Sequence, residues 1–180
     1  MFKKLTLTAT LGALLMMSAN GEEATLRIGI EGAYPPFSYI TPNKKMEGFE
    51  VDLAELFCEK MNREGEIVQA DFDALIPSLN SKRIDAILAS MSITDVRKKA
   101  INFSNKYYQT PAKFVAPTGS TMDVSEKGLK GKVIGVQSGT IHETYMSDNY
   151  KKVATIRSYK SLDDGMYDLD SGRIDLIFAD

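Results

Sequence analysis

One short segment occurs twice in this chain, and this repeat constrains the fold more than any other feature of the sequence. Residues 79–90 (LNSKRIDAILAS) and 169–180 (LDSGRIDLIFAD) carry the same residue at most aligned positions. In each copy an apolar helical pattern ends in polar turn residues, and a short apolar run typical of a buried strand follows. The repeat predicts two similar α/β lobes. The alternative is a chance match between two examples of a common helix-turn-strand motif.

Apolar periodicity predicts strands that alternate with helices on both sides of Pro111, as expected of parallel α/β sheets. In the first half, the predicted elements are a strand at 26–30, a helix at 49–62, a strand at 67–68, a helix at 71–81 and a strand at 84–89. In the second half, they are a strand at 133–136, a helical or irregular segment at 145–150, a strand at 155–157, a helix at 162–169 and a strand at 174–179.

Residues 1–21 have the pattern of a secretory leader. Lys3 and Lys4 precede an apolar run at 5–19, and the small residues Ala19 and Gly21 indicate a cleavage site before residue 22. The apolar run is shorter than the roughly 20 residues that span a bilayer, which favours removal over a membrane anchor. We therefore expect an exported protein.

Composition excludes several classes of protein. The chain has 22 basic and 24 acidic residues, so it lacks the positive charge that a nucleic-acid partner would require. Its one cysteine, Cys58, cannot form an intramolecular disulfide, and it lies beside apolar positions of the helix predicted at 49–62. We therefore expect Cys58 to be a buried small hydrophobic residue. With His142 as its one histidine, the chain is expected to hold no metal and no cofactor.

Polar residues follow the predicted strands in both halves of the chain. They are Glu31, Tyr34, Ser90, Ser92, Arg97, Thr140 and Asp180. In open parallel sheets the carboxyl ends of the strands face the ligand crevice, so we expect these residues to meet around one cleft between the lobes. Each of them alone is as well explained as an ordinary surface residue, and the prediction depends on their convergence.

These residue types suit a ligand that carries both a carboxylate and an ammonium group. Arg97 offers a planar, permanently charged fork that matches a carboxylate. Backbone N–H groups in the turn at 138–141, which leads into a helix, favour the same anion. Asp180, assisted by Ser90, suits the ammonium group.

Two aromatic residues and a second acid indicate the rest of the ligand. Tyr34 and Phe72 could stack on either side of an extended aliphatic or guanidinium side chain. Glu31 would then meet a positive charge at the far end of that side chain. The predicted ligand is therefore arginine, lysine, ornithine or histidine.

Several longer motifs occur in one order along the chain. They are YPPF at 34–37, GFEVDLA at 48–54, FDALIPSL at 72–79, SMSIT at 90–94 followed by Arg97, and LKGK at 129–132. Together they resemble the periplasmic amino-acid-binding proteins of ABC importers (family 3 solute-binding proteins). The likeness is greatest to the branch that binds lysine, arginine, ornithine and histidine, and it covers nearly everything from Leu26 to Asp180.

The resemblance implies the two-lobed periplasmic binding protein type II fold. This is an α/β fold with parallel-core sheets and helices on both faces, and its C-terminal part is missing from this chain. The implied organisation is a signal peptide at 1–21, a first lobe at 22–109, a hinge crossing at 110–113 and a second lobe at 114–180. Both lobes are then incomplete, and we expect reduced stability and weak ligand affinity.

The resemblance also implies a role for each matching position. Arg97, Ser92 and the turn at Thr140 and Ile141 would hold the α-carboxylate, and Asp180 with Ser90 would hold the α-ammonium group. The positions implied at or near the side chain of the ligand are Glu31, Tyr34, Phe72, Ala89, Gln137 and His142. Ala89 stands where relatives often have serine, and Glu31 stands where some have aspartate.

The function implied is capture of a free amino acid and delivery to the membrane permease of an ABC importer, by a periplasmic monomer without catalysis. One alternative is a cyclohexadienyl-dehydratase-like enzyme, for which Glu31, His142 or Asp180 would have to serve as general acid. The other alternative is the ligand-sensing domain of a receptor.

Overall fold

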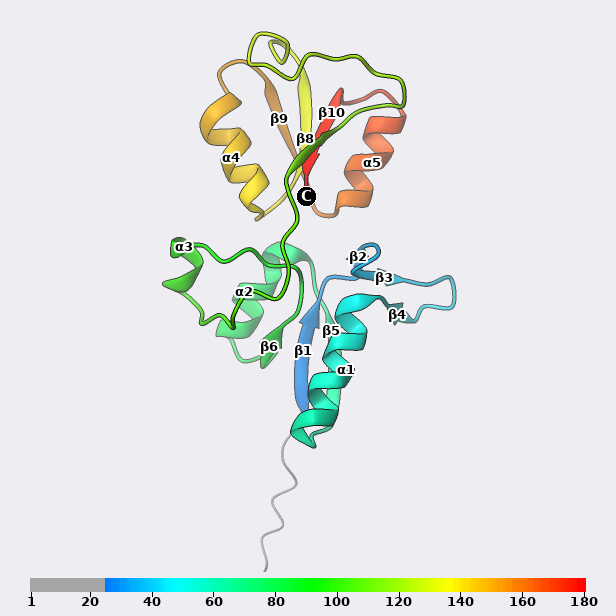
Figure 1. The fold of residues 1–180 in the computed structure, drawn as a ribbon, viewed down its shortest axis with the longest axis vertical. Coiled ribbons are helices and arrows are strands. Elements are labelled where there is room, and N and C mark those ends of the chain that lie inside the picture. The colour runs from blue at the N-terminus through cyan, green and yellow to red at the C-terminus, as the bar shows by residue number, and fades with distance from the viewer. Residues whose placement is uncertain (1–24) are drawn as a thin grey trace, which may run out of the picture.

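Two of the three β-sheets organise residues 25–180, the part of the chain that this computed structural model describes. The predicted signal peptide lies outside the described residues. One sheet has the strand order β5-β1-β6 (Gly65–Gln69, Leu26–Ile30, Ala86–Ile87). The other has the order β7-β10-β8-β9 (Lys113–Val115, Leu176–Ala179, Val133–Gln137, Thr155–Tyr159). We call the units built on these sheets the N-lobe and the C-lobe. The lobes are stacked along the long axis of the molecule, and one strand-free stretch of chain joins β6 to β7 (Figure 1).

The N-lobe carries a parallel sheet and a small antiparallel one. Its elements are β1 (Leu26–Ile30), β2 (Ala33–Tyr34), β3 (Ser38–Ile40), β4 (Met46–Glu47), α1 (Phe49–Met61), β5 (Gly65–Gln69), α2 (Phe72–Asn80), β6 (Ala86–Ile87) and α3 (Asp95–Lys98). The alternation of side chains along β1 decides which helix lies on which face. Ile28 and Ile30 pack with α1, whereas Gly29 faces Leu75 of α2 and Ile84.

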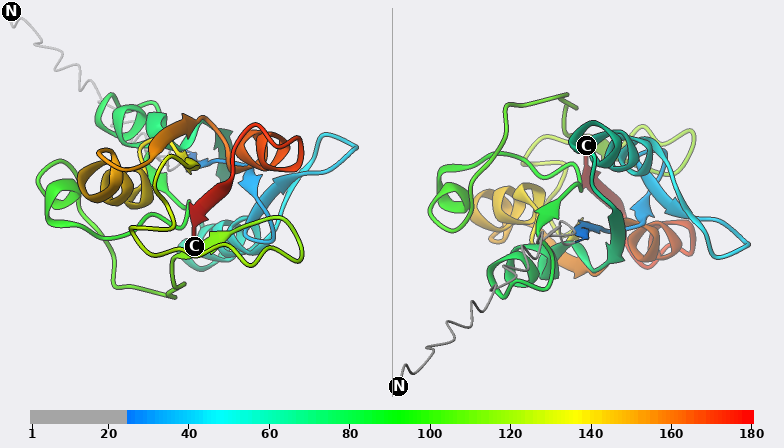
Figure 2. Two further views of the ribbon diagram at one scale, coloured as in Figure 1. Left: turned by 90° about the horizontal axis from the view of Figure 1, so that it is seen from above. Right: turned by 90° about the horizontal axis from the view of Figure 1, so that it is seen from below.

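The C-lobe repeats this plan. Its elements are β7 (Lys113–Val115), β8 (Val133–Gln137), α4 (Ile141–Tyr150), β9 (Thr155–Tyr159), α5 (Leu162–Asp170) and β10 (Leu176–Ala179). Ile134 and Val136 of β8 pack with α4, and Ile177 of β10 packs with α5 on the other face. Views along the long axis show helices on both sides of the sheets (Figure 2). The predicted α/β fold with helices on both faces is therefore confirmed.

The sequence repeat corresponds to the same structure in both lobes. Ile84 and Ile174 lie over glycines of the neighbouring strand. A Cβ atom added to Gly29 would come within 2.4 Å of Ile84 Cδ1, and one added to Gly135 within 2.7 Å of Ile174 Cδ1. Only glycine leaves room for an isoleucine at this separation, so the helix-turn-strand unit packs against its sheet in the same way twice.

The repeated aspartate also has one role in both lobes. Asp85 Oδ2 accepts a hydrogen bond from Arg27 N at 2.9 Å, and Asp175 Oδ2 accepts one from Val133 N at 2.8 Å. Each aspartate thereby fixes the start of the first parallel strand of its lobe, which is β1 in the N-lobe and β8 in the C-lobe. A chance match between the two segments does not explain these paired contacts.

Most predicted elements are present, with four differences. The strand predicted at 84–89 is limited to Ala86–Ile87, because Ile84 packs back over the sheet and Ser90 turns the chain with a φ of 50°. The segment at 145–150 is helical and belongs to α4, which begins at Ile141. The antiparallel strands β2–β4 and β7 were not predicted, because runs of two or three residues give no clear period.

The fourth difference concerns the buried face of α1. Cys58 is buried, as predicted, together with Val51, Ala54 and Glu50. Phe49, by contrast, is 46% exposed, and so is much of the other large apolar surface of this helix. The small residues Ala54 and Cys58 let the helix approach the sheet closely. The buried face of α1 therefore consists of these residues, Val51 and the Glu50 carboxylate, and does not include its largest apolar side chains.

Candidate ligand-binding site

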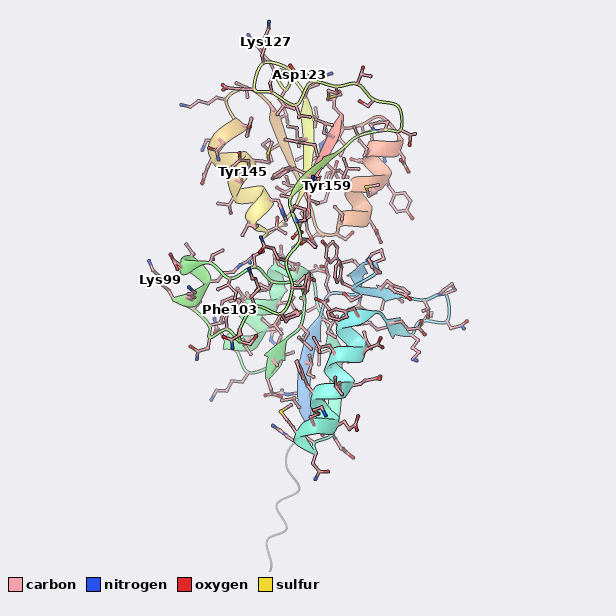
Figure 3. The ribbon with its side chains drawn as sticks, in the orientation of Figure 1. Lys99, Phe103, Asp123, Lys127, Tyr145 and Tyr159 are labelled. Atoms are coloured by element: carbon pink, nitrogen blue, oxygen red, sulfur yellow. The ribbon has the colours of Figure 1, made fainter. Side chains whose placement is uncertain are left out.

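One cavity lies between the lobes and holds about 460 Å³ of free space, including solvent at its mouth. All twelve site residues predicted from the sequence line it. They are Glu31, Tyr34, Phe72, Ala89, Ser90, Ser92, Arg97, Gln137, Thr140, Ile141, His142 and Asp180. Leu162, Phe178 and Ala179 also line the cavity and were not predicted. Figure 3 shows side chains of both lobes extending into the region between them, with Phe103 labelled in the N-lobe and Tyr159 in the C-lobe.

Arg97 lies at the end of the cavity near α3. Thr94 caps this helix by accepting a hydrogen bond from Arg97 N at 3.2 Å. The guanidinium donates to Ser92 O at 2.7 Å and, across the interface between the lobes, to Gly139 O at 2.9 Å. Its Cζ lies 5.5 Å from the centre of the Phe72 ring. Burial lowers the pKa of Arg97, but a guanidinium stays charged, and two bonds do not exhaust its five N–H donors.

The turn that follows β8 faces Arg97 from the C-lobe. Thr140 caps α4, because its hydroxyl accepts from Glu143 N at 3.2 Å. Gly139 has a φ of 74° and donates its N–H to Glu143 Oε2 at 2.8 Å. The N-terminus of α4 therefore points its partial positive charge toward the same region as the Arg97 guanidinium. Both features suit an anionic group of a ligand.

Asp180 lies at the carboxyl end of β10 and contacts three parts of the molecule. Tyr34 of the N-lobe donates its hydroxyl to Asp180 O at 2.7 Å and to Oδ1 at 3.2 Å. Thr110 in the connecting segment donates to Oδ2 at 2.7 Å, and His142 Nε2 of α4 lies 3.7 Å from Oδ1. Carboxylate oxygens accept more than one hydrogen bond each, so these contacts leave acceptor capacity for an ammonium group.

His142 is a buried neighbour of that carboxylate. Burial lowers the pKa of His142, Asp180 opposes this shift, and Arg97 adds to it. The imidazole is therefore neutral at neutral pH. A neutral histidine does not compete with a cationic ligand for Asp180.

Glu31 follows β1 and is 6% exposed. Burial, together with the carboxylates of Glu50, Asp71 and Asp163, raises its pKa to about 7, while a hydrogen bond from Gln137 Nε2 opposes the rise. Since Gln137 belongs to β8, this bond joins the two lobes. A carboxylate held at this position has a high affinity for any positive charge that enters the cavity.

The two aromatic side chains predicted to stack on the ligand each contact another group of the protein. Phe72 lies under the Arg97 guanidinium, whereas Tyr34 stacks on Phe37 with ring centres 5.2 Å apart. Phe37 in turn stacks on Tyr108 at 5.0 Å. Burial and the nearby Asp180 carboxylate raise the pKa of Tyr34, so its hydroxyl stays a donor.

Three contacts outside the cavity were not predicted. Asp73 of α2 accepts hydrogen bonds from Lys160 Nζ at 2.7 Å and from Ser138 Oγ at 3.1 Å, and both donors belong to the C-lobe. Lys160 lowers the pKa of Asp73. Glu50 accepts from Ser90 Oγ at 2.7 Å behind the cavity wall. Sequence reasoning missed Asp73 and Glu50 because both lie in the first turn of a helix and neither follows a strand. It also missed Lys160, although this residue directly follows β9.

Within residues 25–180, no cluster of three or more histidine, cysteine, aspartate or glutamate side chains could hold a metal ion. No helix in the described part of the chain is long and apolar enough to cross a membrane.

Two α/β lobes that share one cavity, with an arginine from one lobe and an aspartate from the other, define a two-lobed solute-binding protein. Comparison with known proteins gives the family. The model of the bacterial extracellular solute-binding proteins, family 3, matches residues 26–156. The chain belongs to this family.

Individual relatives are similar over most of the chain. The L-arginine-binding protein of Pseudomonas aeruginosa is 41% identical over 180 residues, which is 99% of this chain and 70% of the relative. The histidine-binding periplasmic protein of Escherichia coli is 38% identical over 183 residues, covering 99% of this chain and 70% of the relative. Among solved structures, an ancestral arginine-binding protein bound to arginine matches with a TM-score of 0.83 and 34% identity, over 88% of this chain and 70% of that one.

Proposed function

We propose that this protein captures a free amino acid with a basic side chain (arginine, lysine, ornithine or histidine) between its lobes and delivers it to the permease of an ABC importer. The observation that carries the proposal is the placement of charge. Arg97 from the N-lobe and Asp180 from the C-lobe line one cavity, and the buried Glu31 lines it as well. One cation and two carboxylates complement a ligand that has one carboxylate and two positive groups.

In this proposal Arg97 and the N-terminus of α4 at Thr140 and Ile141 bind the α-carboxylate, with Ser92 supporting Arg97. Ser92 O already fixes the guanidinium by accepting from Nη1. Burial of the carboxylate is tolerable because it meets a permanent positive charge and several N–H donors.

The α-ammonium group binds Asp180 and Ser90 at the opposite side of the cavity. Phe72 and Tyr34 enclose the side chain of the ligand, and its terminal charge lies at Glu31. Ala89, Gln137 and His142 complete the wall, with Gln137 orienting Glu31.

Capture needs no chemical step. Residues 22–109 and 114–180 act as the two lobes, and 110–113 act as the hinge between them. A ligand that bridges Arg97 and Asp180 stabilises the closed arrangement, which the permease then recognises. We infer that the protein works as a periplasmic monomer after cleavage of residues 1–21, without enzyme activity, as the relatives named as binding proteins indicate.

The test is calorimetric titration of the 180-residue chain with the common amino acids, followed by Arg97→Ala and Asp180→Ala. Removing one member of a buried charge pair costs about 2–5 kcal/mol, so each variant should bind at least about thirtyfold more weakly. Arg83→Ala and Asp170→Ala are matched controls, because both residues are exposed and lie outside the cavity. Unchanged arginine binding by either cavity variant would refute the proposed site.

A further inference from the structure

Glu50 is a carboxylate in the interior of the N-lobe that the capture mechanism does not use. It lies in the first turn of α1 and is 1% exposed, among Val51 and the other residues that pack on β1. Burial raises its pKa, and the hydroxyls of Ser90 and Ser38 oppose this rise. Burying a carboxylate costs free energy unless hydrogen bonds or an opposite charge compensate it, so the partners of Glu50 matter.

The strongest contact of Glu50 is with a residue of the cavity wall. Ser90 Oγ donates to Glu50 Oε1 at 2.7 Å. The Ser90 oxygen also accepts a hydrogen bond from the Tyr108 hydroxyl. The Ser90 hydroxyl therefore gives its single proton to Glu50 and accepts one from Tyr108, so the contact proposed above between Ser90 and the α-ammonium group is assigned to the backbone carbonyl oxygen of Ser90.

Ser90 has a backbone conformation that it would not adopt without support. Its φ is 50°, in the left-handed region that is unfavourable for a residue with a Cβ atom. This conformation turns the chain after β6 at a point where Ala89, Ser90 and Ser92 all line the cavity. The corresponding position in the other copy of the repeat is Asp180, which presents its own carboxylate directly.

We propose that Glu50 is a positioning residue of the binding site, which holds Ser90 in its left-handed conformation at the cavity wall. This inference rests on the proposed function, because it concerns affinity for the same ligand. Without the Glu50 acceptor, Ser90 relaxes toward a negative φ. Part of the binding free energy is then used to return Ser90 to its left-handed conformation, so the ligand binds more weakly. Glu50 acts on affinity without touching the ligand.

The test is a set of substitutions at Glu50 and Ser90 in the 180-residue chain, with arginine as the titrant. Glu50→Leu removes the acceptor and replaces a buried charge with an apolar group. Glu50→Gln keeps one acceptor oxygen, and Glu55→Leu is the matched control at an exposed position of the same helix. We expect Glu50→Leu to weaken arginine binding on the order of tenfold, the usual cost of a left-handed residue with a Cβ atom.

Two further readouts separate positioning from a general effect on folding. First, the thermal midpoint of the Glu50→Leu variant without ligand should not fall, because a desolvated carboxylate has been removed. Second, Ser90→Gly in the Glu50→Leu background should recover most of the lost affinity, since glycine adopts positive φ without cost and keeps the backbone carbonyl assigned to the α-ammonium group. Glu50→Gln should show a smaller loss than Glu50→Leu, and Glu55→Leu none.

The inference is overturned if Glu50→Leu binds arginine as tightly as the wild type, or if its loss is equally large with glycine at position 90. If Glu50→Leu does not fold, arginine binding is measured for Glu50→Gln with serine and with glycine at position 90, and the same two outcomes overturn the inference. A wild-type chain that binds no basic amino acid would instead refute the proposed function itself. The two failures are thus distinguishable in one set of titrations.

Discussion

Glu31 gives the sharpest prediction, because its protonation should control affinity for a basic ligand near neutral pH. Its carboxyl group is buried, and its pKa is raised to about 7 mainly by that burial. A cationic side chain beside it requires the ionised form. Ligand binding should therefore expel the proton that the free protein holds below pH 7.

The size of the effect follows from this pKa. If only the ionised form binds, the apparent dissociation constant rises by a factor of 1 + 10^(7−pH). Affinity for arginine should then be roughly tenfold lower at pH 6 than at pH 8, and roughly a hundredfold lower at pH 5. Above pH 8 it should be constant.

The stability of the ligand-free protein should change in the opposite direction. The ordinary pKa of glutamate is 4.5, so between pH 4.5 and about 7 the native state binds more protons than the unfolded state. The contribution of Glu31 to the free energy of unfolding must then fall as pH rises through this window, by at most about 3.4 kcal/mol for a shift of this size. His142, whose pKa is lowered from 6.5, contributes in the opposite direction, so the effect of Glu31 is measured as the difference between the wild type and Glu31→Gln. Greater stability at low pH together with weaker binding is a combination that general acid damage to the protein cannot produce.

The assay is calorimetric titration with arginine between pH 6 and 8, in two buffers of different ionisation enthalpy. The difference between the buffers gives the protons released, which should approach one per ligand near pH 6. Working above pH 6 limits interference from His142, whose pKa burial lowers from its usual 6.5. Glu31→Gln should bind arginine more weakly, with no dependence on pH in this range. Equal pH dependence in the wild type and in Glu31→Gln would refute the reasoning.

Three further predictions concern contacts in and beside the cleft between the lobes. Gly139→Ala should weaken arginine binding about tenfold in calorimetry, because the residue has a φ of 74° and a new Cβ would lie 2.9 Å from Asp73 Cβ; unchanged affinity would mean that the lobes do not approach here during capture. Asp73→Asn, which breaks the 2.7 Å contact with Lys160, should weaken binding at low salt and have less effect in concentrated salt; an effect independent of salt would exclude the ion pair as its cause. Phe72→Leu removes the ring beneath Arg97 and should cost a few-fold in affinity, as expected for a cation–π contact, whereas a loss as large as that of Arg97→Ala would indicate that the leucine disturbs the cavity itself.

Much of the fold was predictable because the sequence carries long-range information in its repeat. Once the two copies are read as helix-turn-strand units, the strand ends at Ser90 and Asp180 fall on the same edge of their sheets. This is why the cavity contains every residue predicted from strand ends. The prediction depends only on the rule that the carboxyl ends of parallel strands face the ligand crevice, so it needs no knowledge of side-chain packing.

The rest depended on contacts that no local pattern encodes. The identity of the residues that join the lobes, such as Asp73 with Lys160, is set by how two separately folded sheets approach each other. Glu50 was overlooked because its place in the helix suggests an exposed acid that favours the helix N-terminus. The rest of the buried face of α1 was also not evident from the sequence, since close packing on β1 buries Ala54 beside Cys58 and leaves larger apolar residues such as Phe49 exposed.

The charges of the cavity explain why a site of this kind should discriminate among amino acids through Glu31 in particular. In the proposed binding mode, Arg97 and Asp180 match the two groups that every free amino acid carries, so they would contribute nothing to the choice among side chains. The third charged group, Glu31, can be either ionised or neutral near pH 7. When it is ionised, a ligand with a neutral side chain would leave a buried carboxylate without an opposite charge, which is unfavourable. When it is protonated, the same ligand meets a neutral acid that can donate a hydrogen bond. Preference for arginine over glutamine should therefore increase with pH and level off above the pKa of Glu31. A preference that stays constant from pH 6 to 8 would show that the specificity lies in the shape of the cavity and not in this carboxyl group.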